Sequence, residues 1–290
     1  MITGKAILPQ GKLFCHKESY FDTKSVSKSM RGKKHAWQKA WGAYMVKKQV
    51  GNINVIIAEN YDELSKLAAD LIANQVQAKK DSTLGLATGS TPIGTYKELV
   101  QKGLDFASIK SFNLDEYFPI AKQSDQSYSY FMNENLFKLT NISADNCDIP
   151  SGEAADAQAE CDRYEIAIKA AGGIDLQLLG LGLNGHIGFN EPDNHFPMKT
   201  HLTPLTQSTI NANSRLFESA DDVPKKAITM GLGTIMSAKS ILMLISGEAK
   251  ADIAKAVICG KVDPQVPGSI LQMHNDVTAI LDKAAAKHFL

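Results

Sequence analysis

A short apolar run that leads into glycines is the feature that most limits how this chain can fold. The segment 174–179 is mostly apolar, and three glycines follow it within 180–185. A run of this length that stops at glycines is typical of a buried strand leading into a tight loop. His186 and Glu191 stand five residues apart just beyond it. Because open α/β sheets bind ligands beyond the carboxyl ends of their strands, the segment predicts a buried strand with a site at its end.

Strand-like and helix-like segments alternate along the chain from residue 53 onward. The expected strands are 53–57, 84–87, 109–114, 174–179, 240–245 and 277–281. The expected helices are 60–80, 92–101, 153–171, 225–238 and one that begins at Glu248. Such alternation predicts an α/β fold of three layers (αβα), in which helices cover both faces of an open, mostly parallel, Rossmann-like sheet. We expect a single α/β domain over 45–290, with a small lid region at about 192–222.

The first 44 residues differ in composition from the rest of the chain. Residues 1–50 carry eleven Lys and Arg side chains against two acidic ones, whereas residues 51–290 carry 20 basic and 29 acidic side chains. The basic extension 1–44 is either an arm or targeting peptide, or a non-native segment that precedes a true start at Met45. We favour the second interpretation, with a disordered or non-native extension, because the alternating pattern is complete without it.

Charge, hydropathy and cysteine spacing exclude several classes of protein. The net charge of −9 over 51–290 disfavours a nucleic-acid partner. No apolar run approaches the length of a membrane span. The four cysteines are scattered and form no Cys-X-X-Cys pair, which suits a reducing compartment and offers no metal knuckle. We therefore expect a cytoplasmic protein with no membrane segment and no metal.

The glycines in 180–185 also fit a dinucleotide fingerprint, Gly-X-Gly-X-X-Gly. That fingerprint needs a helix that starts at its last glycine and an acidic residue about 20 positions further on. Gly188 and Pro192 disfavour the helix, and no acidic residue occupies 194–217. The sequence therefore argues against a nicotinamide cofactor.

The segment Thr88-Gly89-Ser90-Thr91 has the composition of an anion loop. It links a predicted strand to a predicted helix, with Pro92 at the first helical position. Hydroxyls and free backbone N–H groups at a helix start form an anion site, although many capped turns look alike.

Two cations are candidates for the same anion. Arg215 is one of two arginines after residue 50, and its planar guanidinium suits a phosphate. The other, Arg163, stands among acidic residues of a helix and fits a surface salt bridge. Lys250 lies in the first turn of a predicted helix, where a cation opposes the helix dipole unless it meets solvent or an anion. Solvent exposure is the alternative for Lys250.

A pair of carboxylates, Asp115 and Glu116, follows the predicted strand 109–114. Asp115 lies between apolar Leu114 and Tyr117, so partial desolvation should raise its pKa toward that of a useful base. The alternative is that the pair caps a helix.

His186 and Glu191 form a second titratable pair. His186 stands between Gly185 and Gly188 on a loop, where a core position is less expected for a histidine. Glu191 is placed to orient the imidazole and to stabilise its charged form, as in other carboxylate–histidine pairs. A structural histidine is the alternative.

Taken together and in this order, these segments resemble the glucosamine-6-phosphate deaminase family, also called the glucosamine-6-phosphate isomerase family. The resemblance covers about 53–285, and its motifs are specific as an ordered set. The matching segments are Thr88–Pro92, Phe112–Tyr117, Gly185–Pro192, Asn211–Arg215 and Gly247–Lys250.

The resemblance implies an enzyme that converts glucosamine 6-phosphate and water into fructose 6-phosphate and ammonia, without a metal or organic cofactor. It implies that His186, partnered by Glu191, opens the sugar ring by proton transfer at the ring oxygen. Asp115 then moves a proton between C2 and C1. Thr88, Gly89, Ser90 and Thr91 would hold the phosphate, together with Arg215 and Lys250. Many members carry Asp at the position of Asn184. Asn184 can still form hydrogen bonds but supplies no charge.

Two other functions compete with this one. A 6-phosphogluconolactonase would carry Thr-Ala-Ser-Leu-Phe-Pro after its Gly-His pair, where this chain has 187–192 with a different sequence. A non-catalytic sugar-phosphate sensor would need a helix-turn-helix, which 1–50 does not show. Some hexameric members bind an activating sugar phosphate with an Arg and a Lys, where this chain has His201 and Thr203. We therefore expect a monomer or dimer without that activation.

Overall fold

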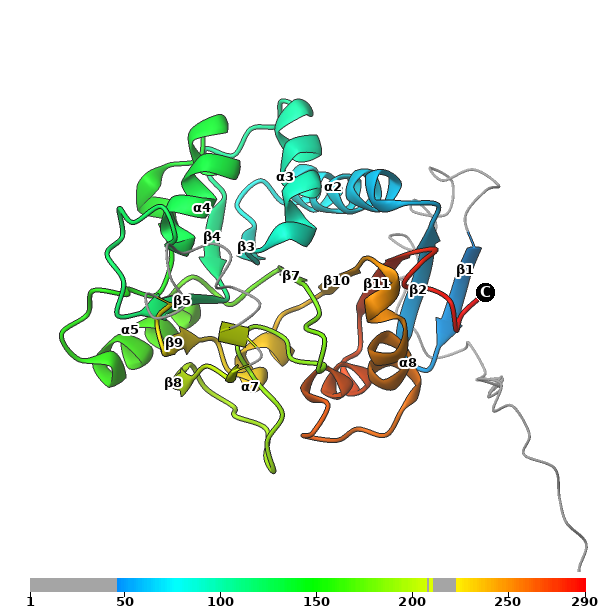
Figure 1. Cartoon of the computed structure of the whole chain (residues 1–290). Coiled ribbons are helices and arrows are strands. Elements are labelled where there is room, and N and C mark those ends of the chain that lie inside the picture. The colour runs from blue at the N-terminus through cyan, green and yellow to red at the C-terminus, as the bar shows by residue number, and fades with distance from the viewer. Residues whose placement is uncertain (1–45, 208, 211–222) are drawn as a thin grey trace, which may run out of the picture. The chain divides into compact units, whose positions relative to one another are not determined.

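The computed structural model describes residues 46–207, 209, 210 and 223–290. All of them belong to the unit Tyr44–Leu290 (Figure 1). The predicted extension 1–44 lies outside the described residues, as does Arg215. The predicted lid, about 192–222, is described only in part, so its motion stays a prediction.

In the described part of the chain, eight strands form the main sheet. They are β1 (Val46–Val50), β2 (Ile53–Ala58), β3 (Thr83–Leu86), β4 (Lys110–Asn113), β6 (Cys147–Asp148), β7 (Leu176–Leu179), β10 (Ile241–Ile245) and β11 (Val277–Asp282). Their order is β1-β2-β11-β10-β7-β3-β4-β6. All pairs are parallel except β1 with β2. Every residue of β3, β7 and β10 is buried, as expected for central strands covered on both faces.

Helices cover both faces of this sheet, which confirms the predicted three-layer α/β fold (Figure 1). One face carries α2 (Tyr61–Ala78), α3 (Ser90–Gln101) and α4 (Tyr128–Asn135), and the other carries α5 (Ala157–Ala170), α7 (Leu232–Met236) and α8 (Ala251–Cys259). Short 3₁₀ turns are η2 (Phe137–Leu139), η3 (Ala144–Asn146), η6 (Glu248–Lys250) and η7 (Pro267–Met273). The chain adds β3, β4 and β6 toward one edge of the sheet and then β7, β10 and β11 toward the other edge. Because crossovers between parallel strands are right-handed, the helices of the first group lie on one face and those of the second group on the opposite face.

The reversal of strand order lies between β3 and β7. From β3 the chain continues outward to β4 and β6, then returns to place β7 on the other side of β3 and continues to β10 and β11. Loops that leave neighbouring strands in opposite directions open a crevice at their carboxyl ends. The fold therefore places a ligand crevice at the ends of β3 and β7.

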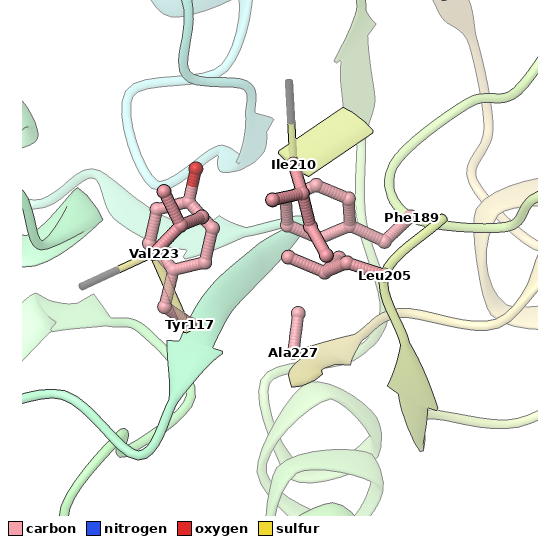
Figure 2. Close-up of a cluster of buried hydrophobic side chains, with 6 residues drawn as sticks. All are labelled: Tyr117, Phe189, Leu205, Ile210, Val223 and Ala227. Atoms are coloured by element: carbon pink, nitrogen blue, oxygen red, sulfur yellow. The ribbon is translucent and has the colours of Figure 1, made fainter. Parts of the chain in front are cut away.

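A second, antiparallel sheet of three strands adjoins that crevice. Its strands are β5 (Asp115–Phe118), β9 (Lys226–Thr229) and β8 (His201–Pro204), with β9 in the centre. Buried apolar side chains pack against it, as Figure 2 shows; they are Tyr117, Phe189, Leu205, Ile210, Val223 and Ala227. Phe189 comes from the loop after β7 and Tyr117 from β5, so this cluster fixes the two segments against each other.

The ends of the helices follow their sequence signals in most places. The Asn60 side chain accepts a hydrogen bond from the Glu63 N–H at 3.0 Å, which confirms the predicted start of α2. The predicted helix 153–171 begins later, because Asp156 caps Gln158 and Ala159 and so fixes the start of α5.

Two expectations about elements are wrong. The first half of the predicted helix 225–238 is β9, because its backbone groups pair with β5 on one side and β8 on the other. Pro92 is not at the first helical position, because α3 begins two residues earlier at Ser90.

Candidate active site

The predicted site residues that the structure describes follow strands at or beside the reversal of strand order. Thr88–Thr91 follow β3, Asp115 follows β4, and Asn184, His186 and Glu191 follow β7. Lys250 follows β10. Since these strands are parallel neighbours, their loops meet at one edge of the sheet.

The loop after β7 folds around His186. The Gly182 N–H donates to the His186 carbonyl at 2.9 Å, and the Gly185 N–H donates to the Gly182 carbonyl at 3.1 Å. A Cβ atom on Gly182 would overlap the His186 ring, so only glycine lets the backbone pass this close. On the far side, the Gly268 N–H donates to the Gly185 carbonyl at 2.8 Å. The backbone that carries His186 is therefore held from both sides, and Gly182 packs against the imidazole.

His186, Glu191 and Asn184 form a connected set, as the sequence predicts. Nδ1 of His186 lies 3.2 Å from Oε2 of Glu191. The Asn184 side-chain amide donates to the same oxygen at 2.6 Å, and its Oδ1 accepts the His186 N–H at 3.2 Å. Asn184 therefore fixes both the carboxylate and the histidine backbone.

The other carboxylate oxygen of Glu191 accepts two hydroxyls that sequence reasoning missed. Thr209 donates to Oε1 at 2.5 Å and Thr206 at 3.2 Å. Burial acts to raise the pKa of Glu191, but the hydrogen bonds from His186, Thr209 and Asn184 and the charge of His186 lower it to about 2. Glu191 is therefore an anion at any physiological pH. The two threonines lie in a segment without regular period, so no sequence signal pointed to them.

Asp115 has the environment of a base. Its side chain is 6% exposed, and no hydrogen bond among the described residues uses its carboxylate. Burial, and then the neighbouring charge of Glu116, raise the pKa of Asp115 to about 8, as the apolar flanks predicted. A Cβ atom on Gly188 would lie 3.5 Å from its Oδ2 atom, so the carboxylate faces the loop that carries His186.

Glu116 takes the capping role that the sequence left open for the pair. Its carboxylate accepts the N–H groups of Tyr128 at 2.8 Å, Ser129 at 2.9 Å and Tyr117 at 3.0 Å. Two of these are the first N–H groups of α4, which have no partner inside the helix. The two adjacent carboxylates thus differ in function, since Glu116 is bound to the backbone and Asp115 is left available.

The segment Thr88–Thr91 forms the start of α3. Gly89 is the N-cap residue and provides no side chain, so the first N–H groups of the helix are not capped by it. The hydroxyls of Thr88, Ser90 and Thr91 make no hydrogen bond among the described residues. Free hydroxyls and N–H groups at a helix start are the parts of an anion site.

Lys250 is half-buried and points to the loop after β7. Its Nζ atom donates to the Leu181 carbonyl at 2.6 Å, and burial lowers the pKa of Lys250. The alternative of a fully solvated lysine is therefore wrong. Arg163 bonds to Asp148 and Glu160, which confirms the surface salt bridge expected for it.

Among the described residues, no three His, Cys, Asp or Glu side chains gather where they could hold a metal ion. None of the helices in the described ranges is long and apolar enough to span a membrane.

The fold is a Rossmann-like α/β fold, and a histidine–carboxylate pair, a buried aspartate and a hydroxyl-rich helix start lie at its strand reversal. The family model of glucosamine-6-phosphate isomerases/6-phosphogluconolactonase matches residues 58–280, and the chain belongs to this family. The resemblance inferred from the motifs is confirmed.

Relatives with high identity cover most of the chain. It is 53% identical over 238 residues to a glucosamine-6-phosphate deaminase of Clostridioides difficile (strain 630), an alignment that covers 81% of this chain and 96% of the relative. A glucosamine-6-phosphate deaminase of Thermoanaerobacter sp. (strain X514) is 52% identical, with 81% and 94% covered.

Solved structures agree with this assignment. A monomeric glucosamine-6-phosphate deaminase is 44% identical, with a TM-score of 0.79, over 81% of this chain and 99% of the other. A 6-phosphogluconolactonase of Thermotoga maritima has a TM-score of 0.64 over 80% of this chain and 99% of the other, but at 21% identity it shows the fold alone.

Proposed function

We propose that this protein is a glucosamine-6-phosphate deaminase, which converts glucosamine 6-phosphate and water into fructose 6-phosphate and ammonia. The observation that carries the proposal is Asp115, a buried carboxylate with a raised pKa that faces the His186 loop. The names of the relatives at above 50% identity support the same reaction.

Ring opening is assigned to His186. The sugar must expose its C1 aldehyde before the C2 proton becomes acidic, so a proton has to reach the ring oxygen. The contact of His186 with Glu191, 3.2 Å long, orients the imidazole. With Nδ1 turned to Glu191, Nε2 is the atom left for the substrate.

The proton transfer between carbons is assigned to Asp115. The ionised carboxylate takes the proton from C2 while the C1 oxygen gains a proton, which leaves an enolamine, and the carboxylic acid then returns its proton to C1. The resulting imine at C2 adds water and releases ammonia. A base with a pKa of about 8 holds the proton between these two steps more readily than an ordinary aspartate would.

The phosphate is assigned to Thr88–Thr91, Lys250 and Arg215. Thr88–Thr91 and Lys250 follow β3 and β10, the two strands on either side of β7, and Lys250 has two ammonium hydrogens besides the one bound to Leu181. Arg215 enters the proposal on its family motif alone, since it lies outside the described residues.

Oligomeric state and location are finer proposals. A monomer or dimer is supported by the monomeric relative with a TM-score of 0.79. A cytoplasmic location is supported by the free thiols of Cys147, Cys161 and Cys259.

The competing function is lactone hydrolysis, which the family description also names. Purified protein supplied separately with glucosamine 6-phosphate and 6-phosphogluconolactone distinguishes the two. We expect ammonia from the first substrate and no acceleration of hydrolysis of the second. The reverse result would assign the protein to the lactonase branch.

A further inference from the structure

A tyrosine hydroxyl contacts the backbone of the first turn of the helix that begins at the anion loop. Tyr61 is the first residue of α2, and its hydroxyl accepts the Gly94 N–H at 2.9 Å. It also lies 3.1 Å from the Ser90 carbonyl and 3.0 Å from the Thr91 carbonyl, and it can donate its one hydrogen to either. No motif in the sequence singled out Tyr61.

The close approach of α2 and α3 depends on Gly94. A Cβ atom on this residue would overlap the Ser65 hydroxyl and lie 2.9 Å from the Tyr61 hydroxyl oxygen. Glycine in the middle of a helix is unfavourable by roughly 0.5–1 kcal/mol relative to alanine. The space that Gly94 leaves is therefore used for the contact between Tyr61 and α3.

The Tyr61 hydroxyl contacts both partners of one backbone hydrogen bond in the first turn of α3. In a regular helix the Gly94 N–H would donate to the Ser90 carbonyl, four residues before it. α3 is α-helical from Ser90 onward, so the Tyr61 hydroxyl is an additional partner for both of these groups. The Tyr61 hydroxyl thereby ties the start of α2 to the first turn of α3 at Ser90, Thr91 and Gly94.

A hollow of about 370 Å³ adjoins the same turn. It is lined by Tyr61, Ser90, Thr91, Ile93 and Ser246. Ser246 is fixed from the other side, because its hydroxyl donates to Asp282 at 2.5 Å. Tyr61 thus lines the same hollow as two residues of the anion loop, Ser90 and Thr91.

We infer that Tyr61 is a positioning residue of the phosphate site: its hydroxyl holds the first turn of α3 in the form that binds the phosphate of the substrate. The inference rests on the proposed function for the identity of the substrate. The binding of a phosphate anion at this site does not depend on that identity. Tyr61 acts through the backbone of Ser90–Gly94 and takes no part in proton transfer.

The test compares Y61F with Y130F, which removes a hydroxyl from an exposed tyrosine of α4. We expect Y61F to raise the KM for glucosamine 6-phosphate about threefold to tenfold, the range for one lost hydrogen bond, with kcat within twofold of the parent. Inorganic phosphate, titrated calorimetrically or as a competitor, should lose affinity by a similar factor. Y130F should change neither value.

Two results would overturn the inference. One is a Y61F variant that binds inorganic phosphate and the substrate as the parent does. The other is a variant whose Tm and kcat fall while KM and phosphate affinity stay unchanged, which would mark a purely structural tyrosine. The calorimetric titration needs no turnover, so a parent protein that releases no ammonia would contradict the proposed function and still leave the inference on Tyr61 tested.

Discussion

Nδ1 of His186 lies 3.2 Å from Oε2 of Glu191, and the same carboxylate accepts the amide of Asn184. The histidine therefore faces an ionised carboxylate. Burial acts to raise the pKa of Glu191, but its hydrogen-bond partners and the charge of His186 lower it to about 2. A neutral amide in the third position orients Glu191 without adding a second negative charge. This arrangement gives His186 one fixed anionic partner for proton transfer.

Replacement of Asp115 by Asn should remove the base and keep the shape of the site. We expect kcat for glucosamine 6-phosphate to fall at least about 10²-fold, with substrate binding largely retained. Steady-state kinetics with a separate binding measurement checks this. Activity within a few-fold of the parent would remove Asp115 from the mechanism.

The pH dependence of activity follows from the pKa of Asp115, which is raised to about 8. The carboxyl gains a proton as the pH falls below this value, so kcat/KM should decline toward acid. A rate profile that stays level from pH 8 to pH 5 would contradict the assignment of Asp115 as the base.

The same shift has a consequence for stability. A carboxyl whose pKa rises on folding binds its proton more tightly in the folded state between pH 3.8 and about 8. The contribution of Asp115 to the free energy of unfolding therefore falls as the pH rises through this window, by up to about 1.4 kcal/mol per pH unit. We expect D115N to have a higher Tm than the parent at pH 8, with the difference shrinking toward pH 4. Parallel Tm–pH curves for the two proteins would contradict this.

Replacement of His186 by Gln should affect the cyclic substrate most, because only that form needs ring opening. An open-chain analogue of the amino sugar phosphate should retain more of its rate. His195→Gln, which changes an exposed histidine, is the matched control. Equal losses on both substrates would show that the role given to His186 is wrong.

Replacement of Lys250 or Arg215 by Ala should mainly raise KM. Each variant loses a charge-assisted contact of roughly 1.5–3 kcal/mol, which corresponds to about a tenfold to hundredfold change. Inorganic phosphate should be a weak competitor of the parent and a weaker one of the variants, and exposed Lys261→Ala serves as the control. Normal substrate binding by both variants would place the phosphate elsewhere.

The enzyme should show hyperbolic kinetics without activation by N-acetylglucosamine 6-phosphate. Where activated members of the family carry two cations, this chain has His201 and Thr203 on β8. Burial lowers the pKa of His201, so it adds no fixed positive charge there. Removal of residues 1–44 should leave this behaviour unchanged. Sigmoidal rates that the acetylated sugar makes hyperbolic, with a hexamer in light scattering, would contradict the prediction.

The main sheet could be predicted from sequence because its central strands are continuous apolar runs. The segment 241–245 is buried throughout, and all five of its residues are apolar in the sequence. The second sheet could not, since β8 and β9 have no such pattern: β9 is fixed by pairing with β5, about 110 residues before it, and β8 by pairing with β9. A local signal does not contain that information.

The residues of the candidate site also fall into those that the sequence predicts and those that it does not. Asp115, His186 and Glu191 were found because each follows a strand and has a chemical reason to be there. Thr209 was missed because a threonine that donates to a distant carboxylate leaves no local trace.

The most direct test of the account is the stoichiometry of the reaction for the parent protein and D115N, assayed side by side. Glucosamine 6-phosphate is supplied, and ammonia and fructose 6-phosphate are each measured in the same sample. The account predicts equal amounts of both products from the parent, and at least about a 10²-fold lower rate of both from D115N. A parent protein that releases no ammonia, or that releases ammonia without fructose 6-phosphate, would contradict it.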